Sequence, residues 1–296
     1  MTTLSKKIDF AVILTVQHAN PNGDPLNGNR PRVTYEGFGE MSDVSIKRKI
    51  RNRLMEMGKP IFVQSDDNRV DDYKSLRERA EGMLKGVDMS DKKKFHEAAC
   101  KAWLDVRAFG QVFAFKAKKG KKSEGEEDSD GVSIPVRGPV SVHPAFSVAT
   151  VLDRSSSIQI TKSVSGETGE KDKRGSDTMG MKHRVDHGVY VFYGSMNPQL
   201  ASKTGFSDED AQAIKEALRT LFVNDESSAR PAGSMAVHKV YWWEHNSPNG
   251  QHSSAKVHRL LKVKVKDGVD EPKDIDDYDI ELGELPGLKC EVIDGE

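Results

Sequence analysis

Apolar side chains occupy both alternating sets of positions between residues 7 and 17. A strand that is apolar on both faces is covered on both sides, so this pattern predicts a central strand of a sheet. Similar alternation predicts further strands in residues 134–160, 189–193, 236–245 and 257–266. The chain is therefore expected to build its core around one sheet.

Apolar residues spaced by three and four positions predict the helices. One helix is expected to begin at Ser42 or Asp43, both good capping residues, and to end near Gly58. A second is expected to follow Ser207. Residues 72–104 are expected to be mainly helical and to form a small insertion.

The order of these elements is compatible with an α+β fold: a split βαβ, ferredoxin-like core that carries insertions. RNA-recognition motifs share this topology. Because many functions share the fold, topology does not by itself predict RNA binding.

Two segments interrupt the pattern. Residues 116–131 contain five lysines followed by five carboxylates, which predicts a mobile loop. Residues 161–188 contain five glycines and many charges and lead into a strand. This composition is typical of a hairpin that projects from the core.

Composition and charge narrow the class of protein. The chain of 296 residues has only two cysteines, far apart in sequence, and no apolar run long enough to span a membrane. We expect a soluble, cytoplasmic protein without a disulfide framework. The net charge of -1 hides an asymmetry, because residues 267–296 carry twelve acidic and two basic residues and the rest carries 43 basic and 34 acidic. A cationic body permits a polyanionic partner, although solvated surface charge is equally compatible with the split.

The predicted loop 20–32 and the helix that follows it carry candidate phosphate ligands. The loop contains Asn22 and Arg30, whose amide and guanidinium donors complement phosphate oxygens. The helix contains Lys47, Arg48, Lys49, Arg51 and Arg53 beside a single carboxylate, Asp43. These cations repel one another unless something negative lies nearby, which favours RNA; a solvated face is the alternative.

Arg107 and the segment 161–188 have weaker support from the residues themselves. Arg107 is expected to pair with Asp105 or another core carboxylate, the usual outcome for a lone arginine in a strand. In the second segment, Met179 and Met181 are candidates for apolar side chains that insert between RNA bases. Lys182, His183 and Arg184 are candidates for binding the RNA backbone. From this composition alone, a disordered loop is the favoured interpretation.

Catalytic motifs are lacking in the sequence. It contains no GxxxxGK[ST] phosphate loop, HExxH pair or GxSxG elbow, and the spacing of His183 and His187 does not recommend a metal site. We expect neither an enzyme nor a cofactor. Histidine-dependent RNA cleavage, with His18, His143 or His183 as the base, is the enzymatic alternative. An RRM-like module that binds a defined RNA sequence is the non-enzymatic alternative.

Several short blocks occur in a specific order along most of the chain: residues 20–25, 29–32, 44–51, 105–110, 138–140, 160–161, 178–184, 228–235 and 241–245. Together they resemble the Csd-two group of the Cas-seven family, the backbone proteins of the type I-C CRISPR Cascade. The family usually has a bulkier apolar residue where Ala108 stands, which is a small departure.

The resemblance implies a hand-like architecture. An RRM-like palm is expected in residues 1–60, 105–160 and 189–266, with helical fingers at 61–104 and a β-hairpin thumb within 161–188. Residues 267–296 would form an acidic C-terminal tail. Each thumb would reach over the RNA held by the neighbouring subunit and displace a base.

The resemblance also implies a function in antiviral defence. The protein would polymerise head-to-tail along the spacer portion of crRNA and leave its bases free to pair with a target DNA strand. Expected partners are copies of itself, subunits of the Cas-five and Cas-eight families and a recruited effector nuclease-helicase. The expected RNA-binding residues are Asn22, Arg30, Lys47, Arg48, Arg51, Arg107, Lys162, Met179, Met181, Lys182, His183 and Arg184.

Overall fold

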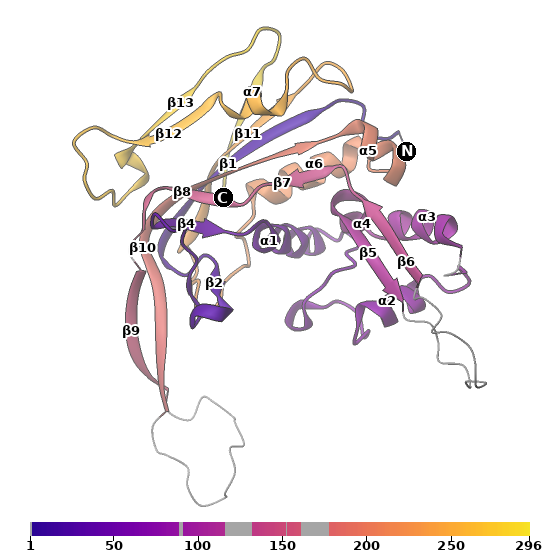
Figure 1. The fold of residues 1–296 in the computed structure, drawn as a ribbon, viewed down its shortest axis with the longest axis horizontal. Helices are drawn as coiled ribbons and strands as arrows, with labels where there is room; N and C mark the ends of the chain where they lie inside the picture. The colour runs from indigo at the N-terminus through magenta and orange to yellow at the C-terminus, as the bar shows by residue number, and fades with distance from the viewer. Residues whose placement is uncertain (1, 89–90, 116–131, 152, 161–177) are drawn as a thin grey trace, which may run out of the picture.

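The computed structural model describes residues 2–88, 91–115, 132–151, 153–160 and 178–296. It has a mixed α/β architecture around one antiparallel sheet (Figure 1). The predicted mobile loop 116–131 and Lys162 lie outside the described residues. Among the described residues, no helix is long and apolar enough to cross a membrane.

The central sheet has the strand order β14-β11-β1-β10-β8-β4. Strands β7 and β9 also pair with β10, outside this path. The bounds are β1 Ile8–Ala19, β4 Phe38–Met41, β7 Val140–Val142, β8 Ala145–Thr150, β9 Asp153–Ile160, β10 Thr178–Met196, β11 Met235–Glu244 and β14 Cys290–Asp294. Strand β1 lies between β10 and β11, as its pattern predicts.

Both faces of β1 are buried because the sheet has a core on each side. Phe10, Val12 and Leu14 face the larger core, which contains the apolar sides of α1 (Asp43–Glu56) and α6 (Asp208–Arg219). Ala11 and Ile13 face a second core. Helices α1, α5 (Pro198–Thr204) and α6 thus cover one face of the sheet (Figure 1).

The other face is partly covered by the C-terminal region. Helix α7 (Ser254–His258), strand β12 (Leu261–Val265) and strand β13 (Tyr278–Leu282) pack there. The strand predicted at 257–266 therefore begins later, since its first residues complete a short helix. Strand β13 and the 3-10 turn η3 (Ile275–Asp277) belong to the acidic segment 267–296, whose carboxylates hid the strand pattern.

A third cluster of apolar side chains lies apart from the sheet. It joins Phe62, Phe95 and Trp103 to Phe113 on the hairpin of β5 (Gly110–Phe115) and β6 (Val132–Arg137). Helices α2 (Leu76–Met83), α3 (Lys92–Ala102) and α4 (Leu104–Phe109) belong to the same region. Arg107 therefore lies in a short helix instead of a strand; six residues are too few for periodicity to distinguish the two.

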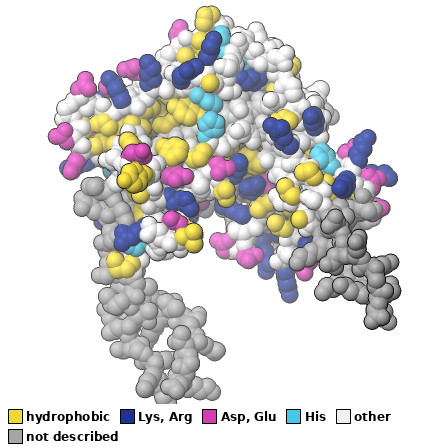
Figure 2. All heavy atoms as spheres, in the orientation of Figure 1, with side chains coloured by type: hydrophobic (Ala, Val, Ile, Leu, Met, Phe, Trp, Pro, Cys, Tyr) yellow, Lys and Arg dark blue, Asp and Glu magenta, His cyan; other side chains and the backbone are white. Residues whose placement is uncertain are grey.

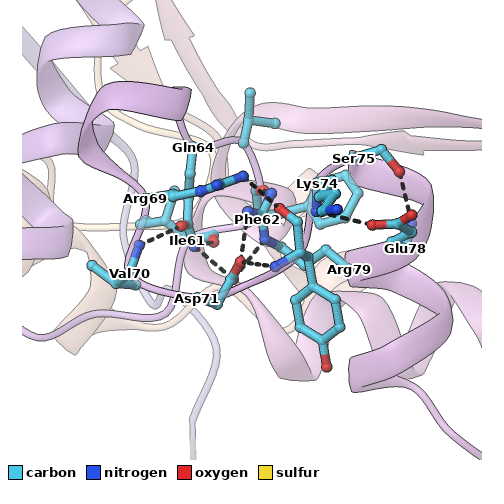
Figure 3. A network of polar contacts seen from close by, with 12 residues as sticks. Ile61, Phe62, Gln64, Arg69, Val70, Asp71, Lys74, Ser75, Glu78 and Arg79 are labelled. Carbon is cyan, nitrogen blue, oxygen red and sulfur yellow. Dashed lines mark hydrogen bonds and ion pairs between the residues drawn. The ribbon is translucent and has the colours of Figure 1, made fainter.

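The start of this region has little regular structure and is held by polar contacts (Figure 3). Apart from the turn η2 (Asp66–Asn68), residues 61–75 form a loop. Arg79 donates to both carboxylate oxygens of Asp71 at 2.7 and 2.8 Å and to the Phe62 carbonyl at 2.9 Å. Gln64 bridges the Ile61 carbonyl and the Val70 amide. Arg79 is only 4% exposed, so its two-point pairing with Asp71 is shielded from water and holds the loop 61–75 against α2.

Strands β9 and β10 form a hairpin that projects from the sheet (Figure 1). Their register runs from Thr178 opposite Ile160 to Val185 opposite Asp153. A hairpin is predicted from the glycine-rich segment 161–188, but its first strand begins earlier, at Asp153. Beside its base lies the loop that follows β1, which contains β2 (Gly23–Asp24), η1 (Pro25–Asn27) and β3 (Arg30–Pro31).

Candidate nucleic-acid interface

Four segments that are distant in sequence meet at the C-terminal end of β1. The Asn20 amide donates to the Ala229 carbonyl at 2.9 Å, and the Gln17 amide donates to the Ser234 carbonyl at 2.7 Å. Ala19 pairs with Val185 at the base of the β9–β10 hairpin. The loop 20–32, the loop 225–234, the start of α1 and the hairpin therefore form one surface, which we call the β1-end surface.

Asn22 joins the loop 20–32 to α1. Its side-chain oxygen accepts hydrogen bonds from the Ser42 amide at 2.9 Å and the Ser42 hydroxyl at 3.0 Å. Ser42 in turn caps α1 by accepting from the Ser45 amide at 3.2 Å. Asn22 thus positions the helix end, and Arg30 lies in the short ladder of the same loop, opposite Asp24.

Two buried polar atoms at the β1-end surface have no hydrogen-bond partner within the described part of the chain: the side-chain oxygen of Asn20 and the hydroxyl of Ser234. Asn20 is 3% exposed and Ser234 is 9% exposed. A buried polar atom without a partner is costly, so a ligand or water that satisfies it is stabilised there. Reasoning from residue type missed both, although the blocks 20–25 and 228–235 contain them.

Arg48, Lys49 and Arg51 of α1 have partners from elsewhere in the fold. Arg51 donates to Asp105 at 3.0 Å, 54 residues away, and Lys49 pairs with Asp225, 176 residues away. Arg48 donates to the Val63 carbonyl at 2.9 Å. The expectation of mutual repulsion counted only carboxylates near in sequence, and folding supplies others.

Lys47 and Arg48 are only partly buried, in contrast to Lys49. The Lys47 side chain is 24% exposed and pairs with Asp43 at 2.9 Å, one turn earlier on the helix. Burial lowers the pKa of the Arg48 guanidinium, and the nearby charge of Arg51 lowers it further. A partly exposed ion pair within one helix contributes little stability, so Lys47 can exchange Asp43 for a phosphate at small cost.

Lys49 is the most buried cation of α1, with a side chain 4% exposed. Burial lowers the pKa of Lys49 to about 8, against the opposing effect of Asp225. Asp225 also accepts from Arg230 at 3.0 Å. The Asp225 carboxylate thus holds the loop 225–234 against α1. Lys49, Asp225 and Arg230 therefore support the β1-end surface from inside the protein.

Asp105 connects α1 to the region of the third apolar cluster. It is 1% exposed and accepts from the amides of Phe62 at 2.7 Å and Val63 at 3.0 Å, in addition to Arg51. The Arg51 guanidinium also lies over the Phe109 ring, 5.1 Å from its centre. Arg51 therefore holds α1 against the segments that contain Asp105 and Phe109.

Arg107 was expected to pair with Asp105 or another core carboxylate. It pairs with another one, Asp210. Two guanidinium nitrogens donate to the two Asp210 oxygens, each at 2.7 Å. Asp210 also completes the capping box of α6 with Ser207. Arg107 thus fastens α4 to the start of α6.

The hairpin presents its predicted residues on alternating sides. Met181 is 57% exposed, and Lys182 and Arg184 are exposed next to it. Arg184 donates to Asp186 at 3.0 Å. Because side chains alternate along a strand, Met181 and His183 share a face, and Lys182 and Arg184 share the other. Met179 pairs with Gln159 through the backbone, and its side chain lies outside what the structure describes.

Two of the histidines considered for catalysis, His18 and His143, contact different parts of β10. His18 lies 3.4 Å from Asp186 on β10. The backbone amide of His143 donates to the carbonyl of Tyr193. Tyr193 is also on β10, seven residues after Asp186. The part of the chain that the structure describes contains no group of three or more His, Cys, Asp or Glu side chains suited to a metal ion.

Comparison with known proteins identifies relatives of one kind. The family model described as "CRISPR-associated protein Cas7" matches residues 6–283. A protein of that name from Haloferax volcanii is 29% identical over 237 residues, 79% of this chain and 68% of the relative.

Two solved structures also align with the chain. A chain of "CRISPR RNA-guided surveillance complex, pre-nicking" aligns with 17% identity and a TM-score of 0.45, over 80% of this chain and 78% of that one. A chain of "CRISPR RNA-guided surveillance complex" aligns with 18% identity and a TM-score of 0.41, over 80% and 68%. These TM-scores are too low to support an inference.

Proposed function

Because the chain belongs to the CRISPR-associated protein Cas7 family, we propose that it is the crRNA-binding backbone subunit of a surveillance complex of type I-C. The sequence blocks that resemble the Csd-two group support the type. In this role the protein binds RNA without converting it, in the cytoplasm, and assembles with the Cas-five and Cas-eight families. Pairing of the guide with a target strand would then recruit the effector nuclease-helicase.

One observation carries this proposal beyond the family match: the β1-end surface brings a cationic helix, two loops and a projecting hairpin together. Its donors suit phosphate and sugar, the parts of RNA common to every guide sequence. A backbone subunit must hold any spacer and leave the base edges free, and such contacts meet both demands.

The strand order supports an RRM-like palm. Strands β11-β1-β10-β8 are antiparallel, with α1 between β1 and β8 in the chain and α6 between β10 and β11, as in a split βαβ fold. We assign the fingers to the third apolar cluster and the thumb to the β9–β10 hairpin.

Within this interface, the chain's own pairing divides the proposed residues into two groups. Lys47, Arg48, Arg30 and the hairpin residues 179–184, with Lys162, are proposed to contact RNA. Asn22, Arg51 and Arg107 are proposed to act chiefly by holding the surface in shape, since the partner of each either caps a helix or joins two segments. These partners are Ser42 at the start of α1, Asp105 and Asp210 at the start of α6.

The test is the mass of the complex formed with single-stranded RNA, measured by light scattering after size-exclusion chromatography. Two unrelated sequences are used, each at two lengths. Mass that rises by whole subunits with length, for both sequences and with the RNA intact, is expected. One subunit per RNA, or binding of one sequence only, would indicate a sequence-specific module, and shortened RNA would indicate a nuclease.

A further inference from the structure

The face of the sheet opposite α1 is not fully covered. Between β8, β10 and β12 lies an open hollow of about 310 Å³, lined by His143, Phe146, Val148, Val191, Tyr193 and Val263 among others. Figure 2 shows hydrophobic side chains gathered on this part of the surface. Phe146 is 44% exposed although it lies in a strand. The hollow continues the second core, against which Val148, Val191 and Tyr193 pack.

The chemistry of the hollow favours a protein side chain over RNA. Among the residues that the structure describes, its lining contains no lysine, arginine or carboxylate. On one side it is bounded by the hairpin of β12 and β13, where residues 261–282 carry eight carboxylates and four lysines. A phosphate backbone would meet an excess of negative charge there without a cation to balance it. An apolar side chain on a cationic neighbour fits both features.

The same chain presents such a side chain on the turn between β2 and β3. Leu26 is 97% exposed, so its side chain has almost no contact with its own chain. The turn is nevertheless fixed, because Asp24 accepts from the Leu26 amide at 3.1 Å and from the Asn29 amide at 2.8 Å. Gly28 and Asn29 adopt the left-handed conformation that closes it, with φ of 59° and 60°. A preformed apolar tip loses little conformational entropy when it binds.

The turn and the hollow lie on opposite sides of the sheet. Figure 1 shows β12 and β13 on one side and the turn beside β2 on the other, with α1. A contact between two different surfaces of one protein is heterologous, and it propagates as an open chain when the rotation does not close a ring. The body outside residues 267–296 also carries 43 basic and 34 acidic residues, which complements the acidic hairpin beside the hollow.

We propose that the hollow between β8, β10 and β12 receives the Leu26 turn of a second copy of this chain. This inference rests on the proposed function and names surfaces through which successive subunits meet on RNA. Phe146 and Val263 contact the incoming leucine, and the contact repeats along the assembly.

The proposal is tested by disulfide cross-linking on RNA. A chain with both Leu26→Cys and Phe146→Cys is expected to give a ladder of covalent oligomers on long single-stranded RNA. Each single variant is expected to give none, and so is Phe146→Cys combined with Val112→Cys, which is 61% exposed on β5. Burial raises the pKa of Cys100 to about 11 and of Cys290 to about 12, so the native thiols react slowly near neutral pH.

A second measurement does not depend on cysteine geometry. Leu26→Asn or Phe146→Asp is expected to weaken assembly on long RNA by roughly ten- to thirty-fold, as for an interface anchor. Position 26 receives a neutral residue because its turn belongs to the loop 20–32 of the β1-end surface, where a new negative charge would repel RNA directly. For Phe146→Asp, binding to an RNA that holds one subunit stays unchanged, because Phe146 lies outside the β1-end surface. Circular dichroism verifies that both variants fold.

The outcomes separate this inference from the proposed function. Dimers from Leu26→Cys by itself would show a symmetric contact and overturn the pairing. Tyr35, in the loop after β3, is also fully exposed. A ladder with Tyr35→Cys in place of Leu26→Cys would show that another exposed side chain enters the hollow, and it would overturn the pairing as well. Normal growth of mass with RNA length in both Leu26→Asn and Phe146→Asp, without a ladder, overturns the surface and leaves the function. If the unmodified chain does not grow in mass with RNA length, the function fails and this inference falls with it.

Discussion

Arg107 and Asp210 form a two-point ion pair whose side chains are 17% and 10% exposed. Removing one partner leaves a poorly solvated charge, so Arg107→Met is expected to lower the free energy of unfolding by roughly 2–4 kcal/mol. Chemical denaturation measures this. The double variant with Asp210→Asn is expected to lose less than the sum of the single variants. A stable Arg107→Met variant with weakened RNA binding would instead place Arg107 on RNA.

Lys49 predicts a pH dependence. Its pKa is about 8 in the folded chain because of burial, below the ordinary value of 10.5. Between these values the unfolded chain binds the proton that the folded chain has released, so stability rises with pH relative to a chain without Lys49. The difference in unfolding free energy between the natural chain and Lys49→Met is expected to shift by up to roughly 2–3 kcal/mol between pH 7 and pH 10, in favour of the natural chain.

The shift should appear in that difference because other titrating groups are common to both chains. Arg230 continues to pair with Asp225 in the variant. A difference that stays constant from pH 7 to pH 10 would mean that Lys49 keeps an ordinary pKa.

Single residues also show where sequence reasoning ends. The cations of α1 were predicted from composition and lie on a helix with the predicted cap, but their partners Asp105 and Asp225 come from distant parts of the chain. Pairing of this kind depends on tertiary structure, which spacing does not encode. Asn20 and Ser234 were missed for the same reason, since only folding brings their loops together.

At the scale of elements, α1 is expected to hold RNA through its exposed edge. Lys47→Met is expected to weaken binding of unrelated RNA sequences alike and to reduce the slope of log affinity against log salt by about 1. Lys203→Met is the matched control, because Lys203 is an exposed lysine on α5, outside the β1-end surface. Equal slopes for Lys47→Met and the natural chain would remove Lys47 from the interface.

Elements with strong periodicity were predictable, and elements defined by partners were not. Strand β1 and helices α1 and α6 carry apolar patterns matched to their burial, and all three were predicted. Strand β14 has mostly exposed positions, so little alternation marks it. It forms because the edge of β11 offers it hydrogen bonds, a cause that lies outside its own sequence.

At the scale of the molecule, the acidic C-terminal segment closes the sheet. Strand β14 pairs with β11, and Ile293 packs on the larger core. Ending the chain after residue 289 is expected to lower the free energy of unfolding by roughly 2–4 kcal/mol, through lost hydrogen bonds and exposed apolar surface.

Glu291→Gln is the control for this truncation. It removes only the charge of a surface pair with Lys215 and should change stability by less than about 1 kcal/mol. Chemical denaturation of both variants measures the difference. An unchanged midpoint after truncation would mean that the segment does not support the sheet in solution.

Strand β10 runs through Thr178–Met196 without a break, from the hairpin into the middle of the sheet. Its inner part is clamped by β1, beginning at the pair Ala19–Val185, while its outer part is bonded to β9. In mechanical terms the hairpin is a cantilever built into a wall, with no hinge at the wall. A force on the tip of the hairpin therefore bends the sheet and does not rotate the hairpin about its base. The angle between the hairpin and the body is set by the fold of the protein and not by the molecule that the hairpin contacts.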